Sequence, residues 1–473
     1  MSRFSVRSLR FAAAMALLLF ACGKTEHDQP PHGPTDAQKL QLFLNEHFPL
    51  HGLVTGVQLS IRDKPDPEAQ TIGWLRIGTR IRLGKDKKGS ATCQSGWHPL
   101  YPQGWVCLGE GVSVSNTPPS SDIASNPPAK DAALPYRYYM VKDLGVPEYH
   151  RLPSRNEQRA ALAYSKHYLE LLGKDEKRAQ RFLDGELKNE IERPSVVRRL
   201  LRHGFFLAAA GIETRAKRNF IRTVSGRYIK EAHLAERSGS DFHGEWINDE
   251  NRLPIAWAIR GASPLKKHES KDGSIKLIKD ESHDGIARLS KLDWKGLKNI
   301  NGKVYHELGD ELYLRNWYAA VAKKVKPPKG VKDSDTWIHI ALNQQTLVLY
   351  HGKKPIYATL ISTGVTDFET PTGEFHVRDK RVADTMANIG ADLDNSYSIE
   401  DVPWTQYIKG SVAIHGAFWH NRFGLRNSHG CINLAPKDAH VVFNETKPEL
   451  PEGWHGIHAP SIGEKGSLVW ISD

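Results

Sequence analysis

The chain has 473 residues, and its 65 Lys and Arg against 54 Asp and Glu give a formal net charge of +11. With 39% hydrophobic and 9% aromatic residues it has the composition of globular domains, and its length predicts about two to four of them. The basic residues are dispersed, and zinc-finger, RNP-type and basic heptad patterns are missing from the sequence, so no nucleic acid partner is expected. A solvated basic surface, or attraction to an anionic cell wall or membrane face, fits this charge better.

The first 22 residues are typical of an export signal. Three arginines precede an apolar run, 11–20, that is too short to cross a bilayer as a permanent helix. The run ends in Leu19–Cys22, which resembles a bacterial lipobox, although Phe20 stands where a smaller residue is more common. We therefore predict cleavage before Cys22 and a lipid on that cysteine that anchors the protein to a membrane, with ordinary secretion as the alternative. Either outcome predicts a periplasmic or cell-envelope protein.

The stretch 23–51 begins with polar and Pro-rich residues and is predicted to be a tether. Residues 52–115 contain short β-like runs separated by turn residues, a pattern typical of a small barrel. The expected strands are 57–61, 73–75, 79–83, 96–98 and 104–107. The Leu-x-Ile-Arg opening at Leu59–Arg62 and the Gly-Trp-Val ending at Gly104–Val106 resemble bacterial SH3 domains. The resemblance implies a module that binds the cell wall, or a spacer barrel that packs against its neighbours.

Residues 116–135 are rich in Pro, Ser, Ala and Asp, a composition that predicts a linker. The middle segment, 136–330, is predicted to be mixed α+β. Ser154 and Glu157 form a capping box for a helix that ends near Gly173. One side of that helix is expected to carry Ala161, Leu162, Tyr168, Leu169 and Leu172.

More helix is expected after Gly173 to about position 189, and a short helix from Pro194. The runs 219–229 and 302–305 are β-like. Within this segment, 222–228 and 312–318 faintly resemble further SH3-like strands, separated by a helical insertion. The sequence indicates no role for the segment beyond positioning the two ends of the chain.

Residues 333–473 contain the side chains that indicate a catalytic function. Alternating residues at 337–341, a turn at 343–345 and a run at 346–350 predict a hairpin, and the strand-like 411–414 delivers His415 at its end. The block Ser428–Asn433 (SHGCIN) adds a thiol, a second imidazole and a glycine. A thiol needs a base to become a nucleophile near neutral pH, and the oxyanion it creates needs donors. The pattern therefore predicts nucleophilic catalysis by Cys431.

These motifs resemble the L,D-transpeptidases of the YkuD family, whose signature is His-Gly followed by Ser/Thr-His-Gly-Cys-hydrophobic-Asn. The resemblance covers 333–473, about a third of the chain. It includes the hairpin 337–350, the Ser-Thr-Gly at 362–364 and the Thr-Pro-Thr-Gly turn that begins at Thr370. It implies a mainly β protein, with a YkuD-type β-sandwich preceded by the SH3-like barrel and the α+β segment. After Cys431, a short helix is expected to start at Pro436.

The resemblance implies acyl transfer on peptidoglycan stem peptides, without metal or cofactor. Cys431 would form a thioester with a stem tetrapeptide, release the terminal D-alanine and pass the acyl group to an amine. His415 would act as the base and hold a thiolate–imidazolium pair that lowers the thiol pKa, with the Gly416 carbonyl orienting its ring. The remaining residues would act through the backbone or hold the loop: N–H groups of His429, Gly430 and Cys431 as an oxyanion hole, and Ser428 and Asn433 as supports.

Other interpretations of the same residues have less support in the sequence. A zinc site from His415, His420, His429 and Cys431 lacks the short ligand spacings of such sites. Ser263–Lys266 satisfies S-x-x-K but has no S-D-N or K-T-G companion. Water as acceptor would make the protein an L,D-carboxypeptidase, and a dead catalytic domain would leave a wall-binding lipoprotein. If Cys22 is lipidated and Cys431 is catalytic, Cys93 and Cys107 remain, and an exported chain is expected to pair them as a disulfide.

Overall fold

The computed structural model describes residues 35–90, 93–109, 111–119, 127–187, 190–388 and 397–473. The chain separates into two compact units, Met1–Glu46 and His47–Asp473. In the first unit, the described part is nearly all of helix α1 (Asp36–His47), which buries none of its side chains and occupies part of the predicted tether. The predicted signal and Cys22 lie outside the described residues. None of the helices in the described ranges is long and apolar enough to cross a membrane.

The second unit begins with the N-terminal β module (residues 47–115). Strand β1 pairs with β4 and β8, β2 pairs with β3 and β7, and β6 pairs with β5 and β7, all antiparallel. The prediction of several short strands here is confirmed, whereas the likeness to SH3 domains stays a prediction. The strands are β1 (Leu50–Val54), β2 (Gln58–Arg62), β3 (Thr71–Arg76), β4 (Arg80–Leu83), β5 (Lys88–Ser90), β6 (Cys93–Pro99), β7 (Trp105–Cys107) and β8 (Val112–Ser115).

The predicted disulfide is confirmed. Cys93 and Cys107 are bonded between β6 and β7, with their Cα atoms 5.9 Å apart. The bond closes a loop of 14 residues, which in the loop-entropy model stabilises the fold by about 3 kcal/mol. It therefore holds together a module whose own core is small.

The middle segment starts with two helices among short strands. The capping box of α2 is present, because the Ser154 and Glu157 side chains each bond the other's backbone N–H. Leu162 and Leu169 were expected on the buried side but are 44% and 37% exposed, because Tyr164 and Leu171 occupy that face. The elements are β9 (Arg137–Val141), β10 (Val146–Tyr149), α2 (Arg155–Leu172), α3 (Glu176–Leu183), β11 (Val197–Leu201), β12 (Phe206–Arg215), β13 (Arg218–Thr223), β14 (Tyr228–Lys230), η1 (Glu231–His233) and β15 (Leu234–Arg237).

The helix predicted from Pro194 is wrong, because the chain there turns into strand β11, which pairs with β10. Further on, β18 to β23 form a five-stranded sheet with β20 outside it, and β20, β17 and β24 form a three-stranded one. Lys266 of the discarded S-x-x-K motif forms an ion pair with Asp280 at 3.1 Å. The strands are β16 (Glu245–Trp246), β17 (Ile255–Ala258), β18 (Leu265–Glu269), β19 (Ile275–Lys279), β20 (Lys291–Leu292), β21 (Trp294–Ile300), β22 (Lys303–Leu308), β23 (Tyr313–Arg315) and β24 (Ala319–Ala322).

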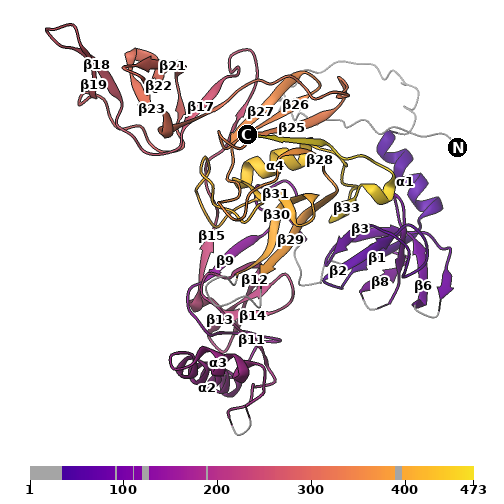
Figure 1. Ribbon diagram of the computed structural model, residues 1–473. Coiled ribbons are helices and arrows are strands. Elements are labelled where there is room, and N and C mark those ends of the chain that lie inside the picture. The colour runs from indigo at the N-terminus through magenta and orange to yellow at the C-terminus, as the bar shows by residue number, and fades with distance from the viewer. Residues whose placement is uncertain (1–34, 91–92, 110, 120–126, 188–189, 389–396) are drawn as a thin grey trace, which may run out of the picture. The chain divides into compact units, whose positions relative to one another are not determined.

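The last part of the chain has the predicted β-sandwich architecture. One sheet has the order β16-β27-β26-β25-β34-β28, and β29 to β33 belong to a second, larger sheet (Figure 1). Ile338 and Leu347 of the first sheet share one buried core with Ile414 and Ile432 of the second. The elements are β25 (Thr336–Ala341), β26 (Thr346–His351), β27 (Lys354–Leu360), β28 (Gly373–His376), β29 (Asp379–Asn388), β30 (Tyr397–Lys409), β31 (Val412–Gly416), β32 (Ile432–Leu434), α4 (Pro436–Glu445), β33 (Gly456–His458), η5 (Pro460–Ile462) and β34 (Leu468–Ser472).

The predicted boundary at 333 does not separate independent sheets. Strand β16 of the middle segment extends the first sheet by pairing with β27, and β3 of the N-terminal β module pairs with β33. Beside that pairing, Gly73 admits the Trp454 ring so closely that a Cβ would lie 2.3 Å from it. From the predicted linker, Lys130 donates to Trp454 O at 2.7 Å and Trp404 donates to Ala133 O at 2.7 Å. The preceding segments are thus built into the sheets of the last part of the chain.

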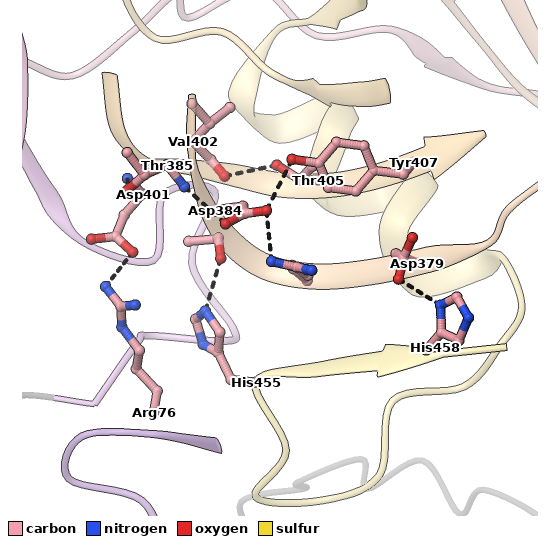
Figure 2. A network of polar contacts seen from close by, with 12 residues as sticks. Arg76, Asp379, Asp384, Thr385, Asp401, Val402, Thr405, Tyr407, His455 and His458 are labelled. Atoms are coloured by element: carbon pink, nitrogen blue, oxygen red, sulfur yellow. Dashed lines mark hydrogen bonds and ion pairs between the residues drawn. The ribbon is translucent and has the colours of Figure 1, made fainter. Parts of the chain in front are cut away.

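A buried network of polar contacts joins the N-terminal β module to β29, β30 and β33 (Figure 2). Arg76 at the end of β3 forms an ion pair with Asp401 at 2.5 Å, and both side chains are less than 10% exposed. Asp384 accepts from Tyr407 at 2.9 Å and from Arg381 at 2.8 Å. Removing one partner of a buried ion pair lowers the free energy of unfolding by more than the intact pair contributes to it, because the other charge is left buried and unpaired.

Arg76→Met should therefore lower the free energy of unfolding by about 3 kcal/mol, because Asp401 would remain buried without its cation. Chemical denaturation of the purified full chain measures this loss. The matched control is Arg76→Met combined with Asp401→Asn, which removes both charges, and asparagine tolerates the positive φ of 51° at position 401. The control should recover most of the stability. If it is as unstable as the single variant, the loss comes from Arg76 packing and not from the charge.

Candidate active site

The candidate site is built on the pairing of two short parallel strands. In β31 and β32, Ile414 lies opposite Ile432, and His415 lies opposite Asn433. The two isoleucines are fully buried in the sandwich core, and side chains alternate along a strand. His415 and Asn433 therefore leave the opposite face of the sheet. Cys431 comes directly before β32 and two residues before Asn433, so the topology brings the segment of the predicted nucleophile next to the strand of the predicted base.

His415 is held as a proton acceptor. Its Nδ1 lies 3.2 Å from the Gly416 carbonyl, and because a carbonyl only accepts, Nδ1 carries the proton and Nε2 a lone pair. Burial lowers the pKa of His415 to about 4, so the imidazole is neutral at pH 7. Gly416 allows close packing here, since a Cβ at this position would lie 3.0 Å from the Pro403 ring. The contact between His415 and the Gly416 carbonyl is the one the sequence predicted.

Cys431 is a free, half-buried thiol. Its sulfur lies 3.7 Å from the carbonyl oxygen of Ser411, a contact in which the protonated thiol is the donor. Burial raises the pKa of the Cys431 thiol. The predicted thiolate–imidazolium pair is therefore wrong for the free site, because burial disfavours the charged form of both groups. In the free site, burial favours the neutral forms of the thiol and of the imidazole.

The loop before Cys431 is fixed by hydrogen bonds from Ser428 and Thr370. Ser428 Oγ donates to the Cys431 carbonyl at 2.6 Å, and its backbone N–H donates to Thr363 O at 3.0 Å. Thr370 Oγ1 donates to the Gly430 carbonyl at 2.8 Å. Gly430 has φ of +105°, a conformation that side chains with a Cβ rarely adopt. These contacts are those expected of a loop whose backbone must keep one shape.

His429 places its ring at the surface, outside the hydrogen bonds that fix the loop. The ring centroid lies 4.6 Å from that of Phe368 and 6.1 Å from that of Tyr397. Burial raises the pKa of Tyr397 and of Tyr407, and the charge of a Cys431 thiolate adds to both shifts. These tyrosines of β30 thus lie near the thiol. Sequence reasoning missed them, because an aromatic residue in a strand carries no signal of its own.

His420, the fourth residue of the zinc alternative, is engaged through both ring nitrogens. Its Nδ1 lies 3.1 Å from the Arg422 N–H, and its Nε2 lies 2.9 Å from the side-chain amide of Asn433. Burial lowers the pKa of His420 to about 4, and the positive charges of Arg422 and Arg288, together with that of His415 when it is protonated, add to the effect. The ring belongs to the hydrogen bonding of the site and offers no free nitrogen to a metal.

Comparison with known families places the catalytic segment. Residues 335–471 match the family model described as the L,D-transpeptidase catalytic domain, YkuD. This segment is similar to the catalytic domain of the YkuD family. A search of curated proteins finds no match to the chain. The matched residues include His415 and Cys431. They include neither the N-terminal β module nor the middle segment.

Solved structures similar to the chain include several L,D-transpeptidases. The catalytic domain from E. faecium is 26% identical, with 29% of this chain and 98% of that chain covered and a TM-score of 0.23. An L,D-transpeptidase from Mycobacterium smegmatis is 16% identical, with 45% and 100% covered and a TM-score of 0.25. L,D-transpeptidase 3 from Mycobacterium tuberculosis, in complex with a faropenem-derived adduct, is 16% identical, with 38% and 78% covered and a TM-score of 0.23.

The neutral forms of Cys431 and His415 lead to a prediction about how alkylation of Cys431 depends on pH. Because burial sets the pKa of Cys431, its alkylation by iodoacetamide should rise with pH through a midpoint above about 8.5, and His415→Ala should leave the midpoint unchanged. Rates of alkylation, measured by mass spectrometry between pH 5 and about 10, test this. His429→Ala, which alters the exposed ring of the same loop, is the control and should follow the wild type. If the wild-type midpoint is below about 7 and is higher in His415→Ala, the free site instead contains the thiolate–imidazolium pair.

Proposed function

We propose that this protein is a peptidoglycan L,D-transpeptidase that works through a thioester on Cys431. One observation supports the proposal: the pairing of β31 with β32 sets His415 opposite Asn433, two residues after Cys431, within the residues that match the YkuD family model. The donor substrate is a stem tetrapeptide, attacked at the carbonyl of its third residue. The acceptor is the amine of a second stem.

In the first step, Cys431 Sγ bonds the carbonyl carbon while its proton moves to His415 Nε2. The N–H groups of His429, Gly430 and Cys431 stabilise the oxyanion. The intermediate collapses to the thioester, and His415 returns the proton to the departing D-alanine amine. Because burial lowers the pKa of His415, its protonated form is a strong acid, which favours this return. In the second step the acceptor amine attacks the thioester, His415 takes the amine proton, and the thiol leaves protonated.

Water in place of the amine would make the same chain an L,D-carboxypeptidase, since both reactions share the thioester. The place of action that we propose is the cell envelope, with the chain anchored by a lipid on Cys22. The N-terminal β module would bind the wall or space the catalytic domain from its anchor.

Acylation of Cys431 tests the catalytic proposal. A carbapenem such as imipenem carries a strained carbonyl that a thiol opens, so intact-mass analysis should show one adduct on the wild type. Cys431→Ala should show none, and His415→Ala should react about 10²- to 10⁴-fold more slowly, the usual contribution of a general base. Wild-type protein that stays unlabelled while remaining folded would favour the inactive wall-binding lipoprotein.

The acceptor is then identified from products. Purified stem tetrapeptides incubated with and without a second stem should yield cross-linked dimers only when the acceptor is present. Tripeptide as the sole product in both samples would identify the carboxypeptidase.

The lipid anchor has its own test. Metabolic labelling with a fatty-acid analogue should mark the wild-type chain and leave Cys22→Ser unmarked, because the thiol of Cys22 is the proposed attachment point. Cys431→Ser, which alters a cysteine that should carry no lipid, is the control and should be marked like the wild type. An unmarked wild type would favour ordinary secretion.

A further inference from the structure

His420 lies on the loop between β31 and the block that contains Cys431, and its hydrogen bonds fix its tautomer. Nδ1 faces the Arg422 N–H at 3.1 Å and so accepts. A neutral imidazole that accepts at Nδ1 carries its proton on Nε2. Nε2 therefore donates to the side chain of Asn433, 2.9 Å away.

This tautomer also orients the Asn433 amide. The two ends of an asparagine amide are distinguished by their hydrogen bonds and not by their shape. A donor on His420 requires that Asn433 present its oxygen to the ring. With the opposite orientation, the buried Oδ1 of Asn433 has no hydrogen-bond partner, although the side chain is almost completely buried. Turning the amide pairs the oxygen with a donor and removes the conflict.

Asn433 lies where this orientation matters. It is directly opposite His415 in the ladder and two residues after Cys431. Once its oxygen is held by His420, the group that Asn433 offers to its surroundings is the NH2 donor. A donor that is turned toward the side of Cys431 would favour negative charge on sulfur and on the acyl oxygen, whereas a carbonyl oxygen would oppose it.

The loop that holds His420 is itself fixed by the middle segment. The Arg288 guanidinium donates to three carbonyls: to Ile259 O at 3.0 Å, to Phe423 O at 2.6 Å and to Asn421 O. Ser240 Oγ bonds the side chain of Asn421 at 2.9 Å. A planar cation with fixed donor directions is suited to holding several carbonyls in one arrangement. The middle segment, for which the sequence indicated no role, thus shapes the loop of the active site.

We propose that His420 is a positioning residue of the transpeptidase reaction, which acts by turning the NH2 group of Asn433 toward the face of His415 and Cys431, and that Arg288 holds its loop in place. The part that concerns turnover rests on the proposed function. The part that concerns the thiol does not, because alkylation of Cys431 needs no peptidoglycan.

Two substitutions at one position separate positioning from packing. His420→Phe keeps an aromatic ring beside Phe423, whose centroid lies 5.2 Å from that of His420, but removes the Nε2 donor. It should lower kcat roughly 10- to 100-fold with little change in KM, the usual cost of losing a residue that orients a reactive group. His420→Gln places an amide N–H near the position of Nε2 and should recover most of the lost kcat.

The pH profile of Cys431 alkylation is the second readout. His420→Phe should move the midpoint upward, because Asn433 can then turn its oxygen to the thiol, while His420→Gln should stay near the wild type. The charged and titratable groups that act on this ring are His415, Arg422 and Arg288, and all three are unchanged in both variants. Thermal unfolding of each variant separates these effects from a loss of folding.

Substitutions of Arg288 test whether the loop of His420 must be held in place. Arg288→Met should raise the midpoint in the same direction as His420→Phe, and Arg288→Lys, which keeps the charge but loses the planar fork, should not fully restore it. The proposal is overturned if His420→Phe matches the wild type in kcat and midpoint, or if His420→Gln is impaired as much as His420→Phe. An inactive wild type with the expected midpoint shifts would count against the proposed function alone.

Discussion

The parallel pairing of β31 with β32 is the constraint on which the site depends. Ile414 and Ile432 anchor the two strands in the core of the sandwich, and this burial fixes the register. A slip by one residue would turn every side chain of a strand to the opposite face. His415 and Asn433 would then enter the apolar core, and the polar face would lose its chemistry. The register of the site is therefore held by side chains that take no part in the reaction.

Burial then determines the electrostatics of the site. Taking the thiol and the imidazole out of water disfavours their charged forms, and the two pKa shifts have opposite signs for the same reason. Such a site stores no ion pair before substrate arrives. In the reaction proposed above, charge would appear only when the sulfur attacks and its proton moves, and the proposed donors are N–H groups of the Gly430 loop. The hydrogen bonds of Ser428 and Thr370 fix the backbone of that loop.

The sequence was sufficient to predict the features that depend on the local order of residues. The block around Cys431, the strand before His415, the helix at Pro436, the disulfide and the capping box at Ser154 were all predicted and are present. Features set by distant packing were not predictable. The pKa directions follow from burial, and Arg288 reaches the carbonyls of Asn421 and Phe423 from more than a hundred residues away. The helix expected at Pro194 failed because pairing with β10 decides that segment, while proline suits a strand entrance equally well.

The N-terminal β module and the active site share one hydrogen-bonded ladder. Strand β3 pairs with β33, β33 with β29, β29 with β30, β30 with β31, and β31 with β32. Side chains reinforce the first junction, where the Arg381 guanidinium lies 4.0 Å from the centre of the Trp74 ring and Trp454 covers Gly73. A ladder of this kind resists hinge motion, because bending at any strand breaks backbone hydrogen bonds. This series of backbone pairings therefore connects the N-terminal β module to the two strands that carry His415 and Asn433.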